Sequence, residues 1–224
     1  MSRARLAQLA GAITAALAFA CSAPAALACA NGYTYAGVYA KQPAPGIAAS
    51  ISMLSMPSVE GGHVAAWVGI GGAGLGPGGT DEWLQVGLAS FDTPDARLYY
   101  ELALPGQSPR FFELARGILP GFVVRVAVLE LPYAPDSWVV VTPKGIAGPF
   151  YLPRSHNRWE PVATAESWAR GGKLCNRYSY RFQNLEIAEK HGSWRPLRHS
   201  ISLQDPGWKV RRSSDGSFNA GSDG

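Results

Sequence analysis

The chain has 224 residues, of which 47% are hydrophobic and 16% charged, with 20 basic side chains against 16 acidic ones. This length is enough for one sizeable domain with a proper core. The small positive balance speaks against a nucleic-acid partner, and the basic pairs near the end, as in "KVRRSS", are expected to lie on the surface.

The first 30 residues have the pattern of a secretory signal peptide. Arg3 and Arg5 precede the apolar run "LAQLAGAITAALAF", and small residues follow up to Ala28 or Ala30, after either of which cleavage could occur. The run is too short for a comfortable membrane span, and no later segment offers roughly 20 continuous apolar residues. We therefore predict that residues 1–30 are removed and that the mature protein is secreted or periplasmic, without membrane association.

The cysteines and histidines give little support for a metal site. Cys21 falls in the leader, and Cys29 stays with the mature chain only if cleavage precedes it. In that case Cys29 and Cys175 could form a disulfide in an oxidising compartment. Three cysteines are too few for zinc, and none of the histidines has ligand spacing, so no metal is expected; these histidines are His63, His156, His191 and His199.

After the leader, short runs rich in Val, Ile, Leu, Tyr and Trp are separated by Gly, Pro, Asp and Ser. The runs that we predict as strands are 33–40, 47–54, 63–70, 82–90, 96–104, 111–116, 122–131, 137–143, 148–153, 160–168, 177–187 and 199–203. There is no long helical period, no internal repeat and no linker. The pattern predicts an all-β chain, an antiparallel sandwich or barrel, with one domain over residues 31–212. Residues 213–224 are expected to form a flexible tail or a final edge strand.

Each of the central strands has one apolar face and an opposite face that carries aromatic and polar side chains. In 63–70, 82–90 and 96–104 the first face carries aliphatic residues and one tyrosine. Antiparallel sheets commonly have one polar face, but large aromatics beside glycine and alanine with a few polar groups are typical of a binding cleft. We therefore predict a site on the opposite face, formed by Trp67, Trp83, Gln85, Tyr99, Glu101, Glu166 and Trp168.

The ordered series "YTYAGVYA", "ISMLSMP", "AAWVGIGG", "LQVGLASF", "LYYELALP" and "TAESW" resembles the glutamic peptidases, or eqolisins, over about residues 33–187. This resemblance implies a concanavalin A-like sandwich of two curved antiparallel sheets and an endopeptidase with a catalytic Gln85 and Glu166. It also implies that Trp67 is the family's cleft tryptophan and Glu101 the acid of the neighbouring strand. We expect the substrate-binding residues to be Trp67, Trp83, Tyr99, Glu101 and Trp168.

The implied chemistry suits these residue types. A carboxylate at Glu166 can act as general base on water, and the Gln85 amide can donate to the developing oxyanion without titrating. Neither a metal nor an organic cofactor is required. The expected partner is a protein or peptide substrate, and the protein is expected to be a monomer.

The sequence departs from the family where Gly71 and Ala89 replace aspartates, which leaves the family's acidic pH optimum open for this chain. Two alternatives also remain open. One is a non-catalytic secreted binding module for a peptide or glycan. The other is a glycoside hydrolase that uses Glu101 and Glu166 as its pair of carboxyl groups.

Overall fold

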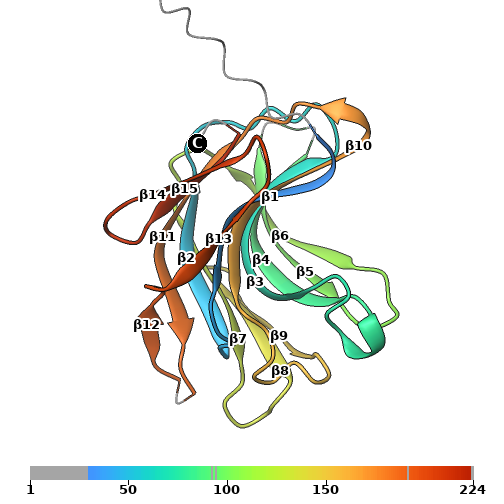
Figure 1. The fold of residues 1–224 in the computed structure, drawn as a ribbon, viewed down its shortest axis with the longest axis vertical. Coiled ribbons are helices and arrows are strands. Elements are labelled where there is room, and N and C mark those ends of the chain that lie inside the picture. The colour runs from blue at the N-terminus through green and yellow to red at the C-terminus, as the bar shows by residue number, and fades with distance from the viewer. Residues whose placement is uncertain (1–29, 92, 94, 191, 223–224) are drawn as a thin grey trace, which may run out of the picture.

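Two antiparallel β-sheets stack face to face in the computed structural model, which describes residues 30–222 except 92, 94 and 191 (Figure 1). Within these residues the only helical element is a short 3-10 turn, η1 (Pro77–Gly79). The predicted all-β sandwich is therefore confirmed. The predicted leader except Ala30, and with it Cys21 and Cys29, lies outside the described residues, whereas Cys175 is disulfide-bonded.

A seven-stranded sheet carries the predicted site residues. Each strand in it runs antiparallel to its neighbours, and some of the strands curve along their length (Figure 1). In spatial order its strands are β13 (Ser200–Gln204), β1 (Ala30–Ala40), β10 (Val162–Leu174), β3 (His63–Gly72), β4 (Glu82–Ser90), β5 (Ala96–Ala103) and β6 (Arg110–Ile118).

An eight-stranded sheet covers the other side of the core. Its main path, in spatial order, is β14 (Lys209–Arg212), β15 (Phe218–Gly221), β11 (Ser179–Ala188), β2 (Gly46–Met53), β7 (Val124–Glu130), β8 (Ser137–Thr142) and β9 (Gly145–Tyr151). The short strand β12 (Trp194–Pro196) pairs with β11 beside this path.

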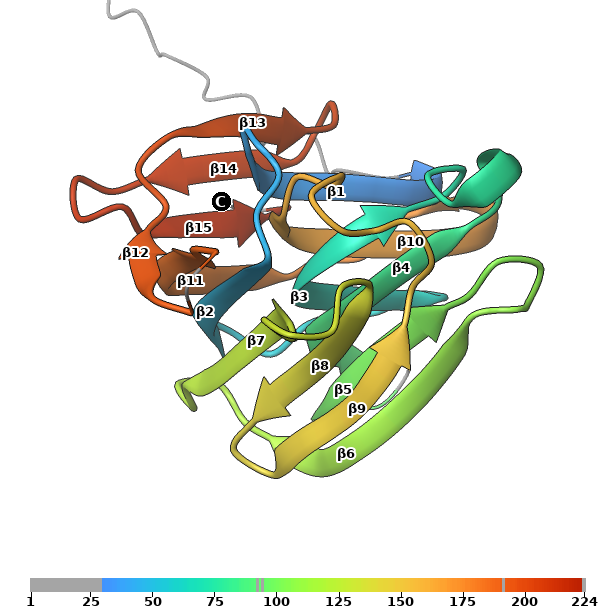
Figure 2. The same ribbon diagram turned by 90° about the horizontal axis from the view of Figure 1, so that it is seen from below.

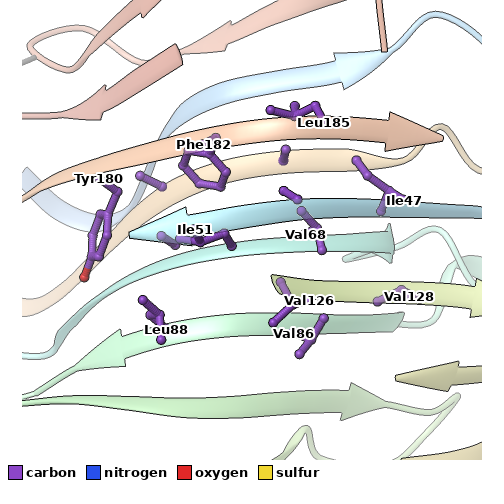
Figure 3. Close-up of a cluster of buried hydrophobic side chains, with 14 of the residues drawn as sticks. Ile47, Ile51, Val68, Val86, Leu88, Val126, Val128, Tyr180, Phe182 and Leu185 are labelled. Atoms are coloured by element: carbon purple, nitrogen blue, oxygen red, sulfur yellow. The ribbon is translucent and has the colours of Figure 1, made fainter. Parts of the chain in front are cut away.

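The core lies between the sheets and follows the two-residue period of the strands. Val86 and Leu88 of β4 are fully buried and point toward the eight-stranded sheet, where Ile51 and Phe182 are also fully buried (Figure 3). Burying an aliphatic or aromatic side chain of this size contributes about 1.5–3 kcal/mol. The apolar face predicted for β3, β4 and β5 is thus the core face, and their other face is turned away from the sandwich.

The C-terminal segment differs from the prediction. β15 lies between β14 and β11 with both edges paired, so it is neither a flexible tail nor an edge strand, and the sandwich continues to residue 221. The physical reason is Phe218, which is 2% exposed and stacks on Phe182 with ring centroids 4.5 Å apart. The polar composition around this single aromatic residue concealed its contribution to the core.

Candidate active site

Four neighbouring strands bring the predicted residues to one face. β10, β3, β4 and β5 lie side by side in that order (Figure 2), and this outward face is directed away from the eight-stranded sheet. In one cross-strand row, Gln85 lies opposite Gly69 and Glu101. In another row, Glu166 lies opposite Ala65. The strand registers therefore place the amide and both carboxyl groups on the same face.

The Glu166 carboxylate is engaged at both oxygens. The residue is 5% exposed, and the indole Nε1–H of Trp67 donates to Oε2 over 3.1 Å. The Nε2 atom of His63 lies 2.9 Å from Oε1. Because an ionised carboxylate only accepts hydrogen bonds, the imidazole must carry a proton on Nε2 to donate to it. Two donors on separate oxygens fix the carboxylate in orientation.

His63 is a site residue that was not predicted from the sequence, because the spacing of the histidines indicates no metal site and points to no other role. It begins β3 on the same face as Ala65 and Trp67 and lies opposite Trp168 of β10. Its ring packs on Trp168, with centroids 5.7 Å apart. His63 lies four residues before Trp67, so the two-residue period of a strand places both side chains on the same face.

A hydrogen bond to Tyr99 of the neighbouring strand β5 holds the Gln85 side chain in place. Gln85 is 8% exposed, and its Nε2–H donates to the hydroxyl of Tyr99 over 3.1 Å. Tyr99 is 2% exposed and stacks on Phe111, with centroids 4.7 Å apart. This differs from the predicted role of Tyr99 as a substrate contact, because Phe111 and the sheet cover the ring. In this structure Tyr99 orients Gln85 instead.

Glu101 and Trp83 form a second carboxyl–indole pair. The Nε1–H of Trp83 donates to Glu101 Oε1 over 3.0 Å. Burial raises the pKa of Glu101, and the negative charge of Glu166 raises it further, while the Trp83 hydrogen bond and His63 oppose the shift. The two carboxyl groups therefore influence one another electrostatically without sharing a donor.

Gly87 lets β4 approach the β3 backbone closely beside the site. It lies opposite Trp67 on β3, where a Cβ added to the glycine would come within 1.9 Å of the Ala66 carbonyl oxygen and 2.6 Å of the Trp67 Cα. Only glycine permits this close approach of β4 to β3. The bare glycine in "LQVG" is thus a requirement of strand packing next to the site.

Gln85 and Glu166 share a face but are not hydrogen-bonded to each other. Their partners on β3, Gly69 and Ala65, are four residues apart. This corresponds to about 13 Å along the strand at about 3.3 Å per residue. Trp67 lies midway between them in the register, so a ligand over its indole would have the amide on one side and the carboxylate on the other.

Aromatic rings form an exposed rim beside these groups. Tyr33 of β1 is 56% exposed and lies 6.2 Å from the Trp168 ring. On the other side, Phe111 of β6 is 38% exposed and meets Phe91 edge-on at 5.6 Å. Exposed aromatic side chains around a few polar groups suit the binding of apolar ligand side chains.

Other features of the described chain lie apart from this face. The described residues contain no cluster of three or more His, Cys, Asp or Glu side chains with the geometry of a metal site. They also contain no helix with the length and apolar character of a membrane span. A groove of about 1070 Å³ is lined by residues of β11 and of the hairpin between β14 and β15, and by none of the predicted site residues.

Comparisons with known proteins by sequence and by structure give different results. No protein-family model matches the sequence, and no curated protein matches it either. A Scytalido-glutamic peptidase solved with a peptide-based transition-state analogue aligns with a TM-score of 0.58 at 14% identity, over 86% of this chain and 98% of that one. SCP-B, a member of the eqolisin family of peptidases solved with the tripeptide Ala-Ile-His, aligns with a TM-score of 0.53 at 15% identity, over the same 86% of this chain and 98% of that one. The chain has a glutamic peptidase-like fold. At this identity the similarity concerns the backbone architecture.

Proposed function

We propose that this chain is an exported endopeptidase of the glutamic type, with Glu166 as general base and Gln85 as oxyanion donor. The main support is the Glu166 carboxylate, nearly buried and engaged at both oxygens by Trp67 and His63, on the outward face of a glutamic peptidase-like fold. A general base needs an oriented and ionised group within reach of the water that it activates.

In the first step, a substrate carbonyl lies over Trp67 with a water molecule between it and Glu166. Glu166 takes one proton from the water while the water oxygen bonds to the carbonyl carbon and the C=O electron pair moves to oxygen. The free N–H of the Gln85 amide donates to the resulting oxyanion. Since an amide does not titrate, this donor is present at every working pH.

In the second step, the tetrahedral intermediate collapses. The carbon–nitrogen bond breaks, its electron pair passes to the departing nitrogen, and Glu166 returns its proton to that nitrogen. The products are a new carboxyl terminus and a new amino terminus, and Glu166 is again a carboxylate. The scheme balances with one water molecule and forms no covalent intermediate with the enzyme.

The aromatic rim would bind the substrate side chains. Trp83 lies beside Gln85, and Trp168 lies beside His63, so the indoles flank the two ends of the reacting group. Together with the exposed Tyr33 they favour peptides with apolar or aromatic residues near the scissile bond. We assign Glu101 to the same surface, where its carboxyl group can hydrogen-bond to the substrate backbone.

The test is cleavage of a denatured protein between pH 2 and 8, with new termini identified by mass spectrometry. The mature wild-type chain is expected to cleave it, and Glu166→Gln and Gln85→Ala are each expected to lose at least about 10²-fold in rate. Glu160→Gln, at an exposed position just before β10, is the matched control and should cleave like the wild type. Circular dichroism verifies that each variant is folded.

Retained cleavage by Glu166→Gln would reject the proposal. A folded wild type that cleaves no protein but binds peptides or glycans would favour the non-catalytic module. Hydrolysis of soluble glycans that depends on both Glu101 and Glu166 would favour a glycosidase instead.

A further inference from the structure

The segment before β3 fixes the position of His63. Asn176 is 1% exposed, and its amide donates to the Gly61 carbonyl over 3.0 Å. Gly62 then turns with φ +76°, and an added Cβ there would lie 2.0 Å from the Trp168 carbonyl oxygen. The chain therefore enters β3 in close contact with β10, and this contact fixes the position of the imidazole. This anchoring involves contacts that link residues more than 100 positions apart in sequence.

Three rings surround the imidazole. Trp168 stacks on it at 5.7 Å and 21°, Tyr33 meets it edge-on at 6.2 Å, and Phe91 lies tilted at 5.8 Å. The His63 side chain is 23% exposed and its partner Glu166 only 6%. Solvent can therefore exchange protons with the imidazole while the carboxylate beside it stays largely shielded.

We infer that His63 is the positioning residue of Glu166 and that the charge on its imidazole tunes the strength of this base in the neutral pH range. The inference rests on the proposed peptidase function. Histidine is the side chain that ordinarily changes charge between pH 5 and 8. In both charge states its Nε2–H can donate to Glu166 Oε1, so the orientation of the carboxylate is kept throughout.

The effect of the charge follows from electrostatics. An imidazolium beside the carboxylate favours the ionised form and makes it a weaker proton acceptor. When the imidazole loses its proton, the hydrogen bond remains but the opposing charge is gone, and Glu166 becomes the stronger base. Because general-base catalysis increases with base strength, kcat is expected to rise as pH passes through the neutral range.

Other titratable or charged groups lie around this pair on the neighbouring elements. The tyrosines have raised pKa values, chiefly through burial, and stay neutral in this range. Arg97 pairs with Glu113 over 3.4 Å. Glu101 has a raised pKa and needs a control of its own. The full set is Tyr33 and Tyr35 on β1, Arg97, Tyr99 and Glu101 on β5, Glu113 on β6, and Tyr178 before β11.

The experiment measures kcat and KM of the mature chain on an internally quenched peptide between pH 4 and 9. His63→Ala is expected to lower kcat about 10-fold or more with KM changed less than about threefold, because the carboxylate loses its orientation. His63→Gln supplies an uncharged N–H and should recover most of kcat but lack the rise through neutral pH. His199→Gln, at an exposed position, is the matched control. Glu101→Gln should keep the rise in kcat through neutral pH.

A second measurement does not depend on activity. Proton NMR of the wild type at neutral pH should show a downfield imidazole N–H, hydrogen-bonded to Glu166, that disappears in His63→Gln and in Glu166→Gln. A rise in kcat that persists in His63→Gln, or a His63→Ala variant with unchanged kcat, would overturn the inference and leave the peptidase proposal intact. A wild type that shows the N–H signal but cleaves nothing would overturn the peptidase proposal, and the role of His63 with it.

Discussion

Glu82 offers a quantitative test of the packing. It begins β4 on the core side, is 0% exposed, and neither of its carboxyl oxygens has a hydrogen-bond partner. Burial, and then the charge of Asp136, raises the pKa of Glu82 from 4.5 to about 7, with Arg158 opposing the shift. The Glu82 carboxyl group therefore binds its proton more tightly in the folded chain than in the unfolded chain. The resulting stability is fully present below about pH 4.5 and is lost as the pH rises to about 7.

The magnitude follows from the shift in pKa. Raising the pKa from 4.5 to about 7, at about 1.4 kcal/mol per pKa unit, gives about 3.5 kcal/mol over the full titration. Glu82→Gln keeps the shape and removes the titration. The stability of this variant relative to the wild type should therefore increase by about 3 kcal/mol between pH 4 and pH 8.

Urea unfolding at the two pH values, followed by tryptophan fluorescence, measures this difference with the disulfide intact. Glu160→Gln is the exposed control and should show no comparable change. If the difference between Glu82→Gln and the wild type is the same at pH 4 and pH 8, then Glu82 is not a buried neutral acid and the reasoning is wrong.

Three further predictions concern the site and the C-terminal hairpin. Gly87→Ala should lower the free energy of unfolding by about 1–3 kcal/mol in a urea titration, because the new Cβ meets the β3 backbone. Phe218→Ala should lower it by about 3–5 kcal/mol, whereas a frayed tail would leave it unchanged. Trp83→Phe removes a hydrogen bond that lowers the pKa of Glu101, so the Glu101 titration followed by carbon NMR should move to higher pH; an unmoved titration would refute that contact.

Much of the fold could be predicted from local patterns. The alternation of apolar residues identified the strands of four or more residues that carry strong β-formers, and it placed Trp67, Gln85 and Glu101 on the outward face, because a two-residue period is a property of the extended backbone. The strands β12 and β14 escaped prediction because they are only three or four residues long and carry few strong β-formers, and β15, also four residues long, was predicted only as a tail or an edge strand. Such segments become strands through pairing with neighbours distant in sequence.

The contacts within the site could not be predicted in the same way. The bond between Trp67 and Glu166 joins residues 99 positions apart and depends on the register of β3 against β10. The burial of Tyr99 depends on Phe111 of the next strand. His63 needs both the register and the turn at Gly62 to reach its partner. Sequence periodicity gives the face of a side chain, whereas its partner is set by the tertiary arrangement.

The most direct test of the peptidase proposal is the rate of peptide hydrolysis by Glu166→Gln, measured beside the wild type at the pH where the wild type is fastest. We expect kcat/KM to fall by at least about 10²-fold while the circular dichroism spectrum and the urea midpoint stay close to those of the wild type. A folded Glu166→Gln variant with kcat/KM within about threefold of the wild type would contradict the assignment of Glu166 as the catalytic base.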